Sequence, residues 1–106
     1  MSMIEASNRW TFTSTGTGKA FNCKGYAQGI TFGIEASTNS TATVQILHRM
    51  GSSAGTYSVL STVQCASTGE FVTDQFLGPL EWVKPRVVDK TAGGATNTVD
   101  VYLLGN

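Results

Sequence analysis

The chain has 106 residues, with seven Lys or Arg, seven Asp or Glu and a formal net charge of zero at pH 7. This length suits one domain and is too short for two of the usual size. The balanced charge excludes the strongly basic footprint that nucleic acids and anionic membranes attract, so we expect neither as a partner. The chain contains 15 Thr, 10 Ser and 12 Gly, which favours an all-β fold with many turns and few helices.

The N-terminal residues show no targeting or membrane segment. Residues 1–10 lack the basic start and apolar run of a signal peptide, and no apolar run approaches the ~20 residues that cross a bilayer. We therefore expect Cys23 and Cys65 to be buried thiols in a reducing compartment and not a disulfide. A domain this small buries barely enough apolar area to offset its loss of conformational entropy, so a partner or an oligomer is expected.

Apolar and polar residues alternate along most of the chain, which is the pattern of strands with one buried face. In residues 27–36, for example, Ile30, Phe32 and Ile34 occupy one face. Gly, Ser, Thr and Pro clusters separate the alternating segments. Strands are expected at about residues 8–14, 21–23, 27–36, 42–49, 57–65, 71–73, 80–88 and 98–104. With no helix to cover the strand edges, these segments predict an antiparallel β-sandwich of jelly-roll or immunoglobulin-like type.

The last two segments predict a hairpin. If Val87 pairs with Val99, the apolar residues of both strands face the same side. Pro85 has no amide hydrogen, so its strand should lie at an edge or meet a neighbour at a break. The outer-face pairs of this register would be Arg86 with Asp100, Lys84 with Tyr102, and Trp82 with Leu104.

No set of residues forms a recognisable catalytic or metal-binding motif. The carboxylates are scattered singly, as solvated surface acids usually are, and His48 is the only histidine. A Cys–His nucleophile would need Cys23 or Cys65 beside His48, and the two cysteines are too far apart in sequence for a zinc motif. The Gly-Thr-Gly-Lys run at 16–19 lacks the other residues of a phosphate loop. We expect no enzyme activity, no metal and no cofactor.

The predicted C-terminal hairpin contains an aromatic and cationic patch. Trp82 would lie beside Lys84, Arg86 and Tyr102, and Trp, Tyr and Arg are enriched where proteins contact each other. The patch therefore predicts a protein-binding surface. Exposed aromatic residues on a small β-sandwich could instead form a carbohydrate-binding platform, whereas Trp10 is expected in the core.

Two regions of the chain resemble a known group of proteins. Residues 78–88 (GPLEWVKPRVV) and 98–105 (TVDVYLLG), joined by a glycine-containing loop, resemble the closing hairpin of small β-sandwich proteins in the virions of tailed bacteriophages. Residues 42–50 (ATVQILHRM) and 57–60 (YSVL) resemble the middle hairpin of the same proteins. The resemblance covers residues 42–105.

The resemblance implies a non-enzymatic virion protein, made in the host cytoplasm and carried on the capsid surface. The expected role is a capsid decoration or cement protein that binds the major capsid protein or other virion subunits. A tail or head-fibre component is a close alternative, and a carbohydrate-binding module is the competing class. Decoration proteins of this type commonly form homotrimers. On this interpretation residues 1–8 are an N-terminal arm anchored by Met3 and Ile4, and residues 9–106 are the sandwich domain.

Overall fold

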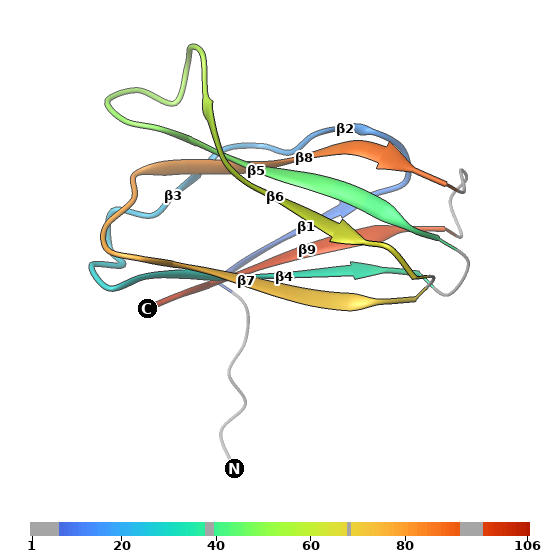
Figure 1. Ribbon diagram of the computed structural model, residues 1–106. Coiled ribbons are helices and arrows are strands. Elements are labelled where there is room, and N and C mark those ends of the chain that lie inside the picture. The colour runs from blue at the N-terminus through green and yellow to red at the C-terminus, as the bar shows by residue number, and fades with distance from the viewer. Residues whose placement is uncertain (1–6, 38–39, 68, 92–96) are drawn as a thin grey trace.

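The computed structural model describes residues 7–37, 40–67, 69–91 and 97–106, and in these it has nine strands in two antiparallel sheets (Figure 1). The described residues contain no helix with the length and apolar character that a membrane crossing requires. The strands are β1 (Asn8–Phe12), β2 (Gly16–Thr17), β3 (Phe21–Asn22), β4 (Gly29–Ala36), β5 (Ala42–Arg49), β6 (Ser58–Cys65), β7 (Phe71–Leu77), β8 (Trp82–Lys90) and β9 (Val99–Gly105).

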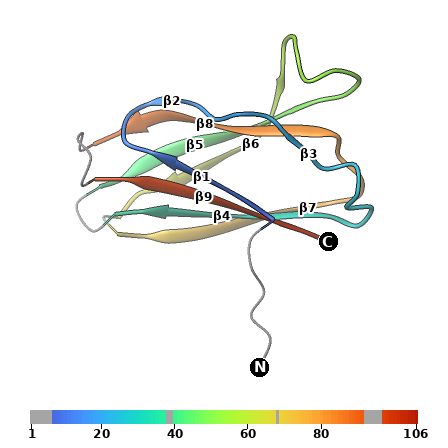
Figure 2. The ribbon, with the colours of Figure 1, turned by 180° about the vertical axis from the view of Figure 1, so that it is seen from behind.

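The two sheets have the topology of a jelly roll. Sheet A has the order β1-β9-β4-β7, and sheet B has the order β2-β8-β5-β6, with β3 also paired to β8. Figure 2 shows β2 and β3 following β8 as two halves of one interrupted strand. With β2 and β3 counted as one strand, β1 pairs with β9, β2/β3 with β8, β4 with β7, and β5 with β6. This is the pairing of one long hairpin that is folded over into two layers. The predicted antiparallel sandwich is confirmed.

The core lies between the sheets and is built from alternate residues of both. Trp10 is 8% exposed, and its indole N–H donates to the carbonyl of Lys19 at 2.8 Å, which satisfies the polar atom of a buried ring. Trp10 therefore lies in the core, as expected. Further fully buried side chains are Ile30, Phe32, Ile34, Val44, Ile46, Val83, Val87, Val99, Val101 and Leu103.

The predicted hairpin between the last two strands is wrong. β9 pairs with β1 and β4 in sheet A, whereas β8 pairs with β5, β2 and β3 in sheet B. The inward faces of β8 and β9 were identified correctly, but they meet across the core and not within one sheet. Alternation fixes which side chains point inward and leaves the pairing partner open. Arg86–Asp100, Lys84–Tyr102 and Trp82–Leu104 are consequently not pairs.

Pro85 lies beside a break in the neighbouring strand, which is one of the two positions expected for it. β8 lies inside sheet B, but Pro85 falls beside the interruption between β2 and β3. The N–H of Gly18 donates to the carbonyl of Pro85 at 2.8 Å, and in a strand the amide of a residue points to the same side as its carbonyl. The missing amide hydrogen of Pro85 therefore faces the break, where the ladder is already incomplete.

The two largest departures from the predicted strands are at β2 and β7. Residues 16 and 17 form β2, where no strand was expected, and β7 continues to Leu77 beyond the expected end at Thr73. Alternation in β7 is obscured because Asp74 occupies an inward position opposite buried Phe32. The Asp74 carboxylate accepts a hydrogen bond from Ser61 Oγ in β6 at 2.6 Å, which gives this polar side chain a partner at the edge between the sheets.

Candidate functional site

The outer face of sheet B gathers three cations. Lys84 and Arg86 alternate with the buried residues of β8, so their side chains point away from the core. Arg49, at the end of β5, is the cross-strand partner of Trp82 and shares its face. Tyr57 joins them because Lys84 Nζ lies 3.9 Å from the centroid of its ring. We refer to Arg49, Tyr57, Trp82, Lys84 and Arg86 as the cationic patch.

Neutral groups hold each cation of the patch. Two guanidinium nitrogens of Arg86 donate to Gln45 Oε1, the Nε bond being 3.0 Å long, and Lys84 makes its cation–π contact with Tyr57. Arg49 donates to the backbone carbonyls of Ser52 and Thr56. The ion pairs formed within the described ranges are Arg9–Asp100 and Lys24–Glu81, which include no residue of the patch. The patch cations are therefore positioned, but their charge is not neutralised by a carboxylate.

The loop of residues 50–57 projects beyond the sheets beside the patch (Figure 1). The guanidinium of Arg49 packs against this loop at Gly55. A Cβ atom at Gly55 would be only 2.7 Å from Arg49 Cζ. Gly55 has φ +121°, a conformation that other residues rarely adopt. Tyr57 Oη donates to the carbonyl of Ser53 at 2.7 Å. Two residues of the patch thus also fix the projecting loop.

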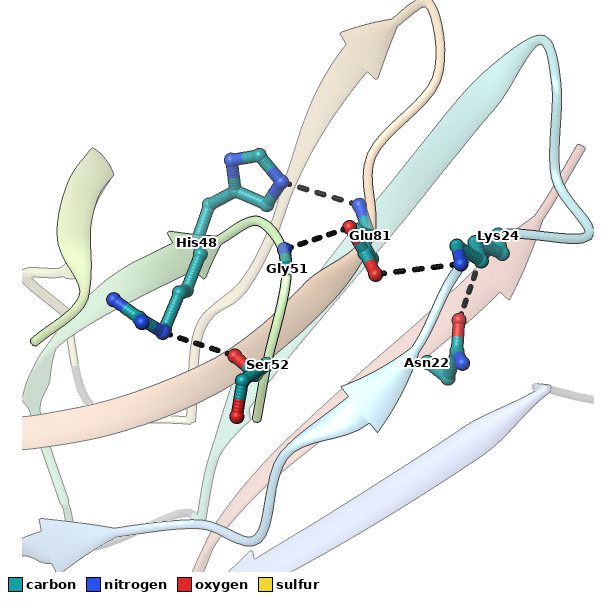
Figure 3. A network of polar contacts seen from close by, with 7 residues as sticks. Asn22, Lys24, His48, Gly51, Ser52 and Glu81 are labelled. Atoms are coloured by element: carbon teal, nitrogen blue, oxygen red, sulfur yellow. Dashed lines mark hydrogen bonds and ion pairs between the residues drawn. The ribbon is translucent and has the colours of Figure 1, made fainter. Parts of the chain in front are cut away.

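Glu81 connects the base of this loop to its surroundings (Figure 3). Its Oε1 accepts the Gly51 N–H at 2.9 Å, and its Oε2 lies 3.5 Å from Lys24 Nζ. The bond from Gly51 lowers the pKa of Glu81, so the carboxylate is ionised at neutral pH. The backbone N–H of Glu81 donates to His48 Nε2 at 3.1 Å, and desolvation lowers the pKa of His48, which keeps that nitrogen free to accept.

The structure separates the four residues of the predicted patch. Trp82, Lys84 and Arg86 lie together on sheet B, with Trp82 half-buried between its cross-strand neighbours on β3 and β5. Tyr102 lies on the outer face of sheet A, where the guanidinium of Arg9 is 5.2 Å from its ring centroid. The expectation that Tyr102 joins the patch is wrong, because it depended on the β8–β9 hairpin. Met3 and Ile4 lie outside the described residues.

Arg49 and Tyr57 are members of the patch that sequence reasoning missed. A signal was available, because the predicted hairpin of residues 42–49 and 57–65 places these two residues at the two ends of one glycine-bearing loop. Residues at the two ends of a hairpin loop lie close together. The side on which Tyr57 emerges was harder to predict, because Ile46 pairs with Ser61 and Leu47 with Val59, which leaves Leu60 as an extra residue in β6.

The cysteines are free and fully buried, as predicted. Burial raises the pKa of Cys23 to about 11 and also raises the pKa of Cys65, so both are protonated and weakly nucleophilic at neutral pH. Cys65 pairs with Ala42, at the opposite end of β5 from His48. Within the described part of the chain no three His, Cys, Asp or Glu side chains gather as metal ligands. What the described residues do offer for binding is the charge and the aromatic surface of the cationic patch.

Comparisons of the chain with protein-family models, with curated proteins and with solved structures found no match. The jelly roll occurs both in viral capsid proteins and in lectins. This topology is therefore compatible with a virion protein and with a carbohydrate-binding module, and it does not choose between them. The choice depends on which surface residues the fold brings together.

Proposed function

We propose that the protein is a non-enzymatic structural protein of a tailed-bacteriophage virion, a capsid decoration or cement protein that docks through its cationic patch. The observation that carries this proposal is the group Arg49, Lys84 and Arg86, held on one outer face without a carboxylate partner among the described residues. The complementary partner is an acidic surface of the major capsid protein or another virion subunit.

The arrangement of the patch suits protein docking in two respects. Its cations are already fixed by Gln45, Tyr57 and loop carbonyls, so binding costs little further side-chain entropy. Arg, Tyr and Trp are also the residue types that contribute most at protein interfaces. Because the whole chain is neutral, attraction to an acidic partner comes from this one face and not from the net charge.

The resemblance supplies the virion assignment and the homotrimer, which we include in the proposal. A tail or head-fibre component would use the same patch on a different virion subunit. In either case the protein is made in the host cytoplasm and functions on the particle. The proposal requires no nucleic acid, membrane, metal or cofactor.

The direct test is sedimentation of the purified protein with empty phage heads. We expect saturable binding that Arg86→Glu weakens by about tenfold or more, because the change reverses a charge facing the acidic partner. Lys19→Glu is the matched control, since Lys19 is an exposed cation outside the patch. Absence of binding by the wild-type protein contradicts the proposal, and equal losses in both variants remove the patch from it.

Met3 and Ile4 enter the proposal as apolar anchors of an N-terminal arm that contacts a neighbouring subunit. The arm must end before Ser7, whose N–H donates to the Leu103 carbonyl at 2.6 Å and whose Oγ accepts the Gly105 N–H at 2.9 Å. We expect deletion of residues 2–6 to lower head occupancy and to leave thermal unfolding unchanged. Unchanged occupancy would show that the arm has no part in docking.

A carbohydrate-binding module remains a second candidate because of Phe71. Its ring is 54% exposed on the outer face of sheet A, and it lies over Gly33, where a Cβ would be 2.8 Å from the ring. An exposed aromatic ring on a flat sheet can stack on a sugar. A glycan array with wild type, Phe71→Ala and Trp82→Ala tests this. Saturable sugar binding that either substitution abolishes would favour the module over the virion protein.

A further inference from the structure

The sandwich has four edges, which differ in how well they are protected against pairing with another chain. β1 is only five residues long, the β2/β3 edge is two short pieces with a break, and β6 has a register shift opposite Ile46 and Leu47. β7 has seven residues in an unshifted register with β4, and it contains no Pro, Gly, Lys or Arg. Short strands, breaks, bulges, Pro, Lys and inward-pointing charges are the usual protections, and of these β7 has only the inward-pointing Asp74.

The free backbone groups of β7 belong to its odd-numbered residues. The N–H of Ala36 donates to the Glu70 carbonyl at 3.1 Å, so the even-numbered positions face β4. Phe71, Thr73, Gln75 and Leu77 therefore direct their N–H and C=O groups away from the sheet. The Gln75 N–H is bonded to Asp74 Oδ1 at 2.9 Å. The N–H groups of the other three have no hydrogen-bond partner within the described ranges.

A second copy of β7 fits this edge in one antiparallel register about a two-fold axis. Hydrogen-bonded pairs must join odd-numbered residues, and a register centred on Asp74 uses all four of them. It pairs Phe71 with Leu77 of the second copy, and Thr73 with Gln75, each pair occurring twice. Phe71 and Leu77 both lie on the outer face, 54% and 82% exposed, so the register covers each exposed side chain with the other.

We propose that β7 is a self-pairing edge through which two copies of this chain join their A sheets into one continuous sheet. The occupant is a second copy because the edge is complementary to itself in both its hydrogen-bonding groups and its apolar ends. A two-fold contact pairs molecules, so it adds to the homotrimer and does not produce it. The inference involves no virion partner and stands independently of the proposed function.

Asp74 is the residue of β7 that limits this pairing. Its Oδ1 occupies the Gln75 N–H, and its Oδ2 accepts from Ser61 Oγ at 2.6 Å, which ties the edge to β6. In the two-fold register the two Asp74 residues lie directly opposite each other, and like charges in that position are destabilising. The wild-type pairing is therefore weak, and removal of this carboxylate strengthens it.

Sedimentation equilibrium of wild type, Asp74→Asn and Asp74→Val tests the inference. Asp74→Asn removes the charge and keeps the shape, so we expect the association constant to rise roughly two- to fivefold. Asp74→Val also frees two Gln75 N–H groups for the new ladder, and we expect a further increase of roughly tenfold. A monomer has one β7 edge and should form a species of twice its molar mass, whereas a homotrimer has three such edges and should link to further trimers.

A second substitution separates edge pairing from general stickiness. Leu77→Lys in the Asp74→Val background places a charge opposite Phe71 of the second copy and should abolish the association. Val59→Lys is the matched control, because Val59 is a 49% exposed apolar residue on neighbouring β6 and outside the register. The inference fails if Asp74→Val associates no more than wild type, forms open-ended aggregates although its unassociated species is a monomer, or loses association equally with both lysine substitutions.

Discussion

The two outer faces of this sandwich are built by the same alternation, and they differ in how their charges are matched. On sheet A, Arg9 lies 3.2 Å from Asp100 and 5.2 Å from the ring centroid of Tyr102, so its charge is compensated within the chain. On sheet B, Lys84 and Arg86 contact a ring and an amide, and no carboxylate among the described residues forms an ion pair with them. A net charge of zero thus conceals a matched face, whose cation has a carboxylate partner, and an unmatched face, whose cations have none among the described residues.

The largest expected effect comes from the core that both faces share. Phe32 is fully buried in β4 and packs edge-to-face on Phe76, with ring centroids 6.1 Å apart. Phe32→Ala should lower the free energy of unfolding by about 3–5 kcal/mol, because it leaves a cavity that the sheets cannot close. Urea unfolding measures the loss. Thr31→Ala, on the outer face of the same strand, is the control, and an equally large loss there would contradict the assignment of the faces.

The next largest effect should be that of ionic strength on the binding of the unmatched face to phage heads. Head binding through unmatched cations should weaken as salt rises from about 50 to 500 mM, since screening shortens the range of the attraction. Lys84→Gln should reduce both the affinity and its salt dependence, and co-sedimentation at several salt concentrations measures the two together. Binding that does not respond to salt would mean that the patch acts through apolar contact alone.

Much of the fold could be predicted because alternation reports burial directly. β4 and β5 follow their predicted bounds closely, and alternation in β8 and β9 predicts their inward residues without reference to their pairing partners. The partners themselves could not be deduced. Val101 would face inward equally well in a hairpin with β8 or beside Trp10 of β1. The observed pairing with β1 depends on contacts between residues about 90 positions apart, which alternation does not report.

The candidate site was predictable to the same extent. Lys84 and Arg86 share a face because they are two residues apart in one strand, and that much is local. Tyr102 was misplaced because its position depended on the wrong pairing. The face of Tyr57 depends on the register shift in β6, and the contacts of Arg49 depend on the conformation of the 50–57 loop, to which it is hydrogen-bonded. Such features follow from tertiary contacts that no local pattern encodes.

A smaller effect is expected from pH at the Glu81 network on sheet B. Desolvation lowers the pKa of His48 in the folded chain below its usual 6.5. Between these two pKa values the unfolded chain therefore binds more protons than the folded chain. Stability should therefore decline as pH falls from about 7 until the folded pKa is reached. His48→Gln, whose amide oxygen can still accept the Glu81 N–H, should reduce this decline. Urea unfolding from pH 7.5 to 5 measures it, and an identical slope in the variant would contradict the role of His48.

The smallest effect should come from Arg9→Ala, which probes the matched face. Arg9 has a side chain 57% exposed, and exposed ion pairs contribute little, so the loss in unfolding free energy should be small. Head binding should not change, because the cation removed was already compensated by Asp100. Arg86→Ala removes the same side chain from the unmatched face, and we expect a similarly small stability loss together with clear loss of binding. Equal binding losses from the two substitutions would mean that charge matching within the chain does not determine which face docks.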